Sequence, residues 1–157
     1  MIYLGIYKLL NYLNMVVVYT DGACKGNPGP GGWGYLILED NTQNIIREDC
    51  GGLPHTTNQE MELTAVYECL KNLSGEDITI FSDSNNYVVK GINEWLSGWA
   101  RNGWKNSKRQ TIANVALWKL VYGRVLLNRV RCVYVKAHNG DKYNEMADAL
   151  ANKGVPQ

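Results

Sequence analysis

The chain contains little cysteine and little histidine, and neither residue type is clustered. No Cys-x-x-Cys pair occurs among the four cysteines, which are Cys24, Cys50, Cys69 and Cys132. The sequence therefore predicts neither a zinc site nor a disulfide framework. Scattered thiols of this kind are typical of proteins in a reducing compartment, so we expect a cytoplasmic location.

The chain also lacks an apolar run long enough to cross a membrane. Its apolar start, residues 1–14, is shorter than the roughly 20 residues that a membrane-spanning helix requires. This stretch has no basic leading end and no small-residue cleavage site, so we do not expect a signal peptide. Polar residues recur in it at every third position, which permits an amphipathic helix or an added strand. We interpret residues 1–14 as an extension of unknown role and residues 15–157 as a single domain.

A large net charge is absent too, but the charges are unevenly distributed. The formal net charge is +1. Basic residues dominate residues 101–142, whereas acidic residues dominate residues 39–62. A molecule polarised in this way could place its basic end on phosphates and its acidic end around cations.

The apolar pattern around four acidic residues predicts that their side chains point toward the interior of the protein. Asp21 follows the run MVVVY and Asp83 follows ITIFS, which are both expected strands. Glu62 and Asp148 lie on the apolar faces of two expected helices. Buried carboxylates require a counter-charge, and oxygen ligands favour Mg²⁺ or Mn²⁺. The four acids predict two-metal catalysis of phosphoryl transfer. The alternative is that one acid caps a helix, one begins a turn and two are solvated.

The periodicity predicts an α/β fold with a five-stranded mixed sheet. The glycine-rich residues 26–34 lack the Gly-Lys-Ser/Thr ending of a P-loop and are interpreted as a turn between antiparallel strands. Three strands should form an antiparallel meander, and two more should be reached through helical crossovers, with helices on both faces. The expected strands are residues 15–24, 32–38, 44–52, 78–82 and 131–137. The expected helices include residues 58–72 and 144–152, and a third with Leu117, Trp118 and Leu120 on one inward stripe.

Four segments around the acids carry a more specific signal. They are TDGACKGNPGPGGWGY around Asp21, TTNQEMELTA around Glu62, SDSNNYVVKGI around Asp83, and VKAHNGDKYNEMADALA around His138 and Asp148. In their order and spacing, over about residues 16–154, they resemble ribonuclease H of type 1.

That resemblance implies a ribonuclease H-like fold and hydrolysis of the RNA strand of an RNA/DNA hybrid, leaving a 5′-phosphate and a 3′-hydroxyl. The four carboxylates match the family's ligands for two Mg²⁺ ions, for which Mn²⁺ is expected to substitute. His138 matches the family's mobile loop histidine, a proton shuttle or an aid to product release. Asn27, Thr57 and Asn58 match groove-lining positions, with Gln59 nearby. Such polar side chains can contact phosphates and the 2′-hydroxyl.

Residues 92–110 interleave tryptophans with basic side chains. Aromatic planes beside cations suit contacts with a nucleic-acid strand, and the segment resembles the basic protrusion with which some family members grip DNA. Tryptophan is also often a core residue, and charge runs are usually solvated. The candidates for this contact are Trp95, Trp99, Trp104, Lys105, Lys108 and Arg109.

The chain departs from the family pattern at two places near the predicted site. One additional residue stands between Asp83 and Tyr87, so the helix that follows is expected to begin with an altered turn. Glu60 adds negative charge near the predicted metal site. A catalytically silent hybrid-binding module and a related nuclease acting on DNA are the alternative functions. We see no accessory domain or obligate protein partner and expect a monomer.

Overall fold

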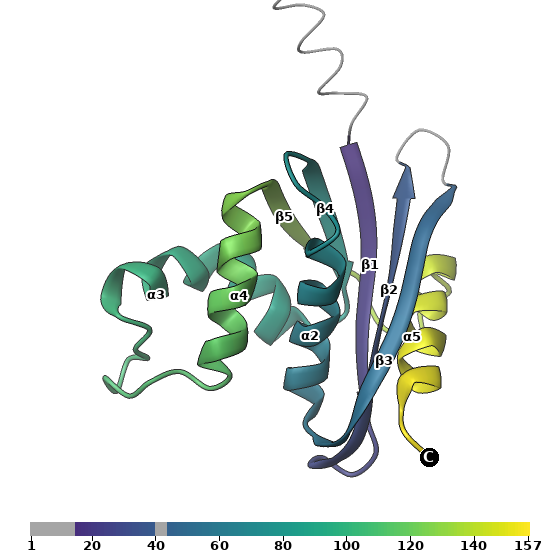
Figure 1. Ribbon diagram of the computed structural model, residues 1–157, viewed down its shortest axis with the longest axis horizontal. Coiled ribbons are helices and arrows are strands. Elements are labelled where there is room, and N and C mark those ends of the chain that lie inside the picture. Colours follow the sequence, from purple (N-terminus) through teal and green to yellow (C-terminus); the bar gives the residue numbers. More distant parts are fainter. Residues whose placement is uncertain (1–14, 40–43) are drawn as a thin grey trace, which may run out of the picture.

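The computed structural model describes residues 15–39 and 44–157. The predicted extension, residues 1–14, lies outside the described residues. The first three strands form an antiparallel meander, and the last two are parallel to the first, in the order β3-β2-β1-β4-β5 (Figure 1). This confirms the predicted mixed five-stranded sheet. The strands are β1 (Met15–Cys24), β2 (Gly29–Glu39), β3 (Ile45–Thr56), β4 (Asp77–Ser82) and β5 (Arg129–Tyr134).

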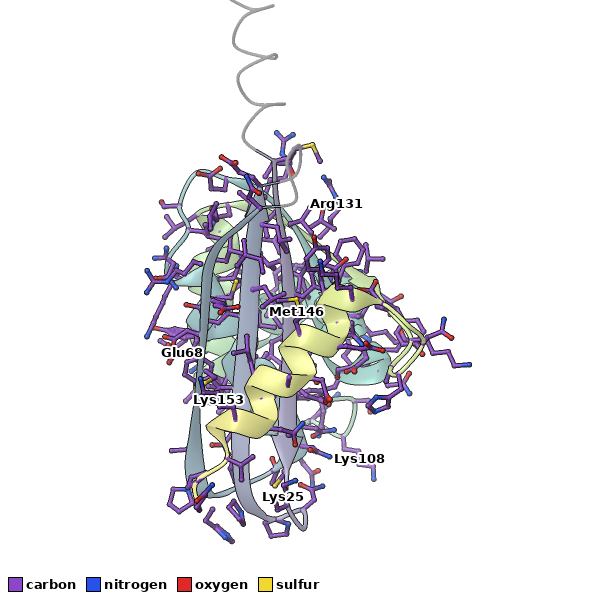
Figure 2. All side chains as sticks on the ribbon, turned by 90° about the vertical axis from the view of Figure 1, so that its right-hand side faces the viewer. Lys25, Glu68, Lys108, Arg131, Met146 and Lys153 are labelled. Atoms are coloured by element: carbon purple, nitrogen blue, oxygen red, sulfur yellow. The ribbon has the colours of Figure 1, made fainter. Side chains whose placement is uncertain are left out.

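Helices cover both faces of the sheet, as predicted. On one face α2 (Asn58–Leu70) packs against β1, β2 and α4 (Val115–Leu126). On the other face α5 (Lys142–Gly154) crosses the strands diagonally (Figure 2). The short helix α3 (Leu96–Asn102) lies beyond α4, away from the sheet (Figure 1). None of the helices among these residues is long and apolar enough to span a bilayer.

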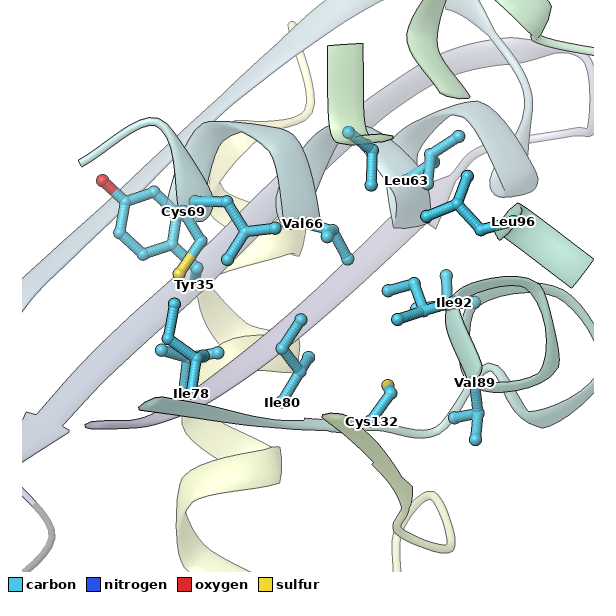
Figure 3. Close-up of a cluster of buried hydrophobic side chains, with 14 of the residues drawn as sticks. Tyr35, Leu63, Val66, Cys69, Ile78, Ile80, Val89, Ile92, Leu96 and Cys132 are labelled. Atoms are coloured by element: carbon cyan, nitrogen blue, oxygen red, sulfur yellow. The ribbon is translucent and has the colours of Figure 1, made fainter. Parts of the chain in front are cut away.

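The larger of two apolar clusters fills the space between the sheet and the α2 side. Figure 3 shows Val66 and Cys69 of α2 facing Ile78 and Ile80 of β4. The prediction that Leu120 shares the inward stripe of Trp118 is wrong, because Leu120 is 52% exposed and Trp118 is fully buried. Two residues along a helix correspond to about 200° of rotation, so these side chains point in opposite directions.

The glycine-rich segment is mostly strand, although it was predicted as a turn. Residues 25–28 make the turn and β2 begins at Gly29. A Cβ atom at Gly32 would lie 2.1 Å from the Ala151 carbonyl oxygen, and one at Gly34 would lie 2.6 Å from the Leu150 Cβ. The glycines therefore allow α5 to pack closely on β2, a requirement that local sequence does not reveal.

Two π-helical turns follow β4, in agreement with the predicted altered helix start. They are η1 (Asn85–Val89) and η2 (Gly91–Trp95). The Val89 amide donates to the Ser84 carbonyl oxygen at 3.0 Å, which spans five residues. A π-helical turn accommodates one residue more than an α-helical turn. The additional residue is thus taken up at exposed Asn85 and Asn86, and Val89 remains buried.

The last strand and the last helix begin earlier than predicted. β5 ends at Tyr134 because this residue pairs with Ser82, the final residue of β4. α5 begins at Lys142 because the Asp141 side chain caps it, accepting hydrogen bonds from the amides of Tyr143 and Asn144. The residues between β5 and α5 form a loop that carries His138.

Candidate active site

Three of the four predicted carboxylates come together just beyond the last paired residues of β1 and β4. β1 and β4 are adjacent and parallel, so Asp21 in β1 and Asp83 just after β4 approach each other. Asp148 of α5 makes a side-chain hydrogen bond with Asp21 across the sheet face. Burial raises the pKa of the Asp21 carboxyl most, and the negative charge of Asp83 and the bond with Asp148 raise it further. Burial likewise raises the pKa of Asp83.

Glu62 reaches this group from α2 because α2 approaches β1 very closely. A Cβ atom at Gly22 would lie 2.4 Å from the Glu62 amide nitrogen and 2.6 Å from the Met61 carbonyl carbon. Burial raises the pKa of Glu62, a hydrogen bond from Ser84 lowers it, and the charge of Asp83 raises it. Glu62 thus lies near Asp83, and the structure brings all four predicted carboxylates into one cluster.

None of the lysine, arginine or histidine side chains within residues 15–39 and 44–157 forms an ion pair with this cluster. The ion pairs between described residues are Lys71 with Glu68, and Arg131 with Asp77 at 3.1 Å, and neither involves the cluster. Burial is the main reason why the pKa values of Asp21, Glu62 and Asp83 rise, and repulsion between ionised carboxylates adds to it. A divalent cation would supply the missing positive charge.

The arrangement of the cluster suits a cation that keeps some of its water ligands better than a cation that is fully enclosed by protein ligands. Among the described histidine, cysteine, aspartate and glutamate side chains, no three are already arranged as ligands of one ion. Mg²⁺ usually keeps several of its waters and is bound through only one or two carboxylates, so it does not require such a cage. The candidate ligands for such ions are Asp21, Glu62, Asp83 and Asp148.

His138 lies at the rim of the carboxylate cluster. It is exposed in the loop between β5 and α5, with a φ of 55°. An electrostatic interaction with His138 opposes part of the rise in the pKa of Asp83, so the two side chains are within electrostatic range. The position agrees with the predicted loop histidine, whose chemical role stays a prediction.

The predicted groove residues lie together where the β1–β2 turn meets the start of α2. The Asn27 Oδ1 accepts a hydrogen bond from the Asn58 amide at 2.9 Å. The Thr57 hydroxyl accepts from the Glu60 amide at 3.2 Å and caps α2. Gln59 is exposed in the first turn of α2. These bonds fix the position of the groove residues, and their contact with substrate stays a prediction.

The three predicted tryptophans do not share one environment. Trp99 packs edge-on against Trp118 with ring centroids 5.2 Å apart, and Trp104 packs in the same way against Tyr122 at 5.8 Å. Both belong to the periphery of the core. Trp95 is 39% exposed and tilts over Trp99. Trp95 is thus the tryptophan best placed to contact a ligand.

The basic candidates lie on an ordered, exposed loop after α3. The Asn106 Oδ1 accepts hydrogen bonds from the Lys108 and Gln110 amides, both at 3.0 Å. The Lys105 ammonium donates to the Thr111 hydroxyl at 3.1 Å. Lys105, Lys108 and Arg109 are all exposed. Three positive charges therefore project from a loop whose backbone is held by its own hydrogen bonds.

Two residues that shape the site were not singled out from the sequence. Gly22 provides the space for α2, and Ser84 donates to the Glu62 Oε2 at 2.8 Å. Each directly follows one of the predicted aspartates, and this adjacency was the only available signal. Both act on Glu62, which is far from them in the sequence.

Comparison with known proteins agrees with the fold. Residues 14–156 match the RNase H family. The chain is 48% identical to the ribonuclease H of Syntrophomonas wolfei subsp. wolfei over 143 residues, which cover 89% of this chain and 95% of that protein.

Solved structures give the same result. The crystal structure of LC9-RNase H1, a type 1 RNase H with the type 2 active-site motif, has a TM-score of 0.79 and 32% identity, covering 90% of this chain and 72% of that one. The foamy viral protease-reverse transcriptase in complex with an RNA/DNA hybrid has a TM-score of 0.77 and 28% identity, covering 88% of this chain and 20% of that one. The family match, the sequence identity and the fold therefore agree: the chain belongs to the ribonuclease H family.

Proposed function

We propose that the protein is an endoribonuclease that hydrolyses the RNA strand of RNA/DNA hybrids and leaves 5′-phosphate and 3′-hydroxyl ends. The observation that carries the proposal is the partly buried cluster of Asp21, Glu62, Asp83 and Asp148, which forms no ion pair with the lysines, arginines and histidines of the described residues. The similar Syntrophomonas protein is named ribonuclease H, and the similar viral protein was solved with an RNA/DNA hybrid. Both support the same substrate.

The four carboxylates are proposed to hold two Mg²⁺ ions when substrate is bound, and Mn²⁺ should substitute. The ions would supply activation of the attacking water and stabilisation of the departing oxygen. The protein places the ligands on two adjacent strands and two helices. The reacting phosphate therefore binds at a preorganised site. His138, at the rim, is proposed to move a proton or to assist product release.

Substrate recognition is proposed to use two groups of residues outside the cluster. One group would contact the substrate backbone near the scissile phosphate and the 2′-hydroxyl, which distinguishes RNA from DNA. Its members are Asn27, Thr57, Asn58 and Gln59. The exposed cations after α3, together with Trp95, would hold the DNA strand through its phosphates. Recognition of this type depends on the shape of the hybrid and not on its base sequence.

A cleavage assay with three duplexes tests the proposed function. Labelled RNA/DNA hybrid, double-stranded RNA and double-stranded DNA should be incubated with Mg²⁺, with Mn²⁺ and with a chelator. We expect cleavage of the hybrid alone, in its RNA strand, and only with a cation. Hybrid binding without cleavage would favour a silent binding module, and cleavage of double-stranded DNA would favour a related nuclease.

The catalytic unit is proposed to be residues 15–157, acting as a monomer without an obligate protein partner. In the same assay, a chain that begins at Met15 should cleave the hybrid at the rate of the full chain. A rate that falls more than about tenfold would show that residues 1–14 contribute to catalysis or folding.

Neutralising the exposed cations after α3 should weaken hybrid binding and its salt dependence. In Lys105→Gln/Lys108→Gln/Arg109→Gln, the slope of log affinity against log salt should decrease by about 2 to 3, since each phosphate contact contributes about 0.9. Filter binding from 50 to 300 mM salt, on the order of the physiological range, measures the slope. A charge-matched control carries Lys71→Gln, Arg129→Gln and Lys153→Gln at exposed positions on other elements. Equal slopes for the two variants would contradict a specific role for the loop.

A further inference from the structure

Ser84 is held on both sides by its neighbours in the chain. Its amide donates to the Ser82 Oγ at 3.1 Å. Its carbonyl oxygen accepts from the Val88 amide at 3.1 Å and from the Val89 amide at 3.0 Å. These bonds fix the Ser84 backbone between the end of β4 and the first π-helical turn, so its side chain has a defined direction.

The Ser84 hydroxyl hydrogen has one acceptor among the described residues. Its Oγ lies 2.8 Å from the Glu62 Oε2 and also accepts from the Val88 amide at 3.3 Å. A hydroxyl has one hydrogen and two lone pairs. Because the Val88 amide occupies an acceptor position, the hydrogen is directed to Glu62. The donor and the carboxylate make a charge-assisted bond, which is shorter and stronger than a neutral one.

Glu62 needs such a partner because its side chain is long and no cation holds it. It forms no ion pair with the lysines and arginines of the described segments. A free glutamate side chain loses considerable rotamer freedom when a ligand immobilises it. The bond from Ser84 fixes one oxygen, Oε2, before any cation binds. A cation bound through the carboxylate therefore has less side-chain freedom of Glu62 to remove.

The π-helical turn η1 preserves this bond despite the additional residue after Asp83. That residue lies downstream of Ser84, and the exposed Asn85 and Asn86 take it up. The turn still supplies the Val88 amide that saturates one lone pair of the Ser84 hydroxyl. The altered helix start therefore leaves the hydroxyl next to Glu62.

We propose that Ser84 is a positioning residue for the Glu62 carboxylate and that η1 holds Ser84 in place. Ser84 would act on the cation only through Glu62. The inference rests on the proposed metal-dependent function of the cluster. Loss of a residue that orients a metal ligand typically weakens metal affinity by about 10- to 100-fold.

Calorimetric titration with Mg²⁺ in the absence of substrate tests the proposal independently of catalysis. In Ser84→Ala the Mg²⁺ dissociation constant should rise about tenfold. Ser84→Thr keeps the hydroxyl and should stay within about twofold of the unmodified chain. Thr64→Ala is the matched control, because it removes a hydroxyl of α2 that donates to the Glu60 carbonyl oxygen and contacts neither Glu62 nor Ser84. It should also stay within about twofold, since Glu62 keeps its partner.

The Mg²⁺ dependence of cleavage should show the same pattern. In Ser84→Ala, half-saturation should move to about tenfold higher Mg²⁺, while kcat at saturating Mg²⁺ should change less than about threefold. Adding Ser84→Ala to Glu62→Gln should not weaken Mg²⁺ binding further, because the carboxylate that Ser84 orients is gone. If Ser84→Ala does not fold, Ser84→Cys offers a weaker donor of similar size and should shift half-saturation in the same direction.

Several results would overturn the role of Ser84. They are an unchanged Mg²⁺ affinity in Ser84→Ala, an equal loss in Thr64→Ala, or a further loss on the Glu62→Gln background. Failure of the unmodified chain to bind Mg²⁺ or to cleave hybrid would instead overturn the proposed function. The two failures are therefore distinguishable in one set of titrations.

Discussion

Replacing Asp21 with asparagine should abolish RNA cleavage and, without a divalent cation, stabilise the folded protein. The carboxylate is buried, with 6% of its residue surface exposed, and lies beside Asp83 and Asp148. Its loss removes a central ligand of the proposed ions. Metal-ion catalysis is worth several kcal/mol, so the rate should fall by more than about 1,000-fold.

The stability gain follows from the pKa of Asp21. Its carboxyl ionises near 3.8 in the unfolded chain, and in the folded protein its pKa is raised to about 9. Between these values the folded state binds more protons, so the free energy of unfolding decreases as the pH rises. Below pH 3.8 both states are protonated and the penalty vanishes. Asp21→Asn removes this penalty and should stabilise the metal-free protein by about 1 to 3 kcal/mol at pH 8, where one pKa unit corresponds to about 1.4 kcal/mol.

Urea unfolding between pH 5 and about 8.5, with a chelator or with Mg²⁺, measures this effect. The unmodified chain should lose stability with rising pH in chelator and regain it with Mg²⁺, whereas the variant should show a flatter profile. Asp49→Asn is the control, since Asp49 is an exposed aspartate on β3. Parallel pH profiles for Asp21→Asn and the unmodified chain would contradict an electrostatic penalty at Asp21.

Gly22→Ala should damage both the fold and the site, although it adds a single methyl group. The new Cβ would meet the Glu62 backbone nitrogen at 2.4 Å and the Met61 carbonyl carbon at 2.6 Å. Backbone atoms cannot rotate away, so α2 must shift from β1. We expect the free energy of unfolding to fall by about 2 to 3 kcal/mol, as for an overpacked core. A shift of about 1 Å in Glu62 should lower kcat about 100-fold even in the folded fraction.

The measurement is urea unfolding together with single-turnover cleavage under conditions where both chains are folded. Gly123→Ala in α4 is the matched control, because its Cβ would meet no atom within 4 Å. Alanine exceeds glycine in helix propensity by about 1 kcal/mol, so this control should be as stable as the unmodified chain or more stable. Full cleavage by Gly22→Ala would show that α2 is not tightly seated at the site.

The sequence alone determined the features that depend on neighbouring residues. The β-branched run before Asp21 predicted a strand, and the apolar pattern around Glu62 predicted the helix that Thr57 caps in the structure. The additional residue after Asp83 predicted the altered turn that the structure shows as π-helical. Periodicity, caps and turn lengths act over a few residues, so they can be read along the chain. The resemblance of four ordered segments then identified the carboxylates as one site.

Only the tertiary structure decided which distant atoms touch. Gly22 contacts the backbone at Glu62, forty positions along the chain, and no local pattern requires it. The same is true of the bond between Ser84 and Glu62 and of the direction of Trp99, which faces Trp118 of another helix. Such contacts depend on how whole helices dock on the sheet, because close packing leaves each side chain one space to fill. The residues of the site could therefore be identified from short sequence segments, whereas their geometry depends on tertiary packing.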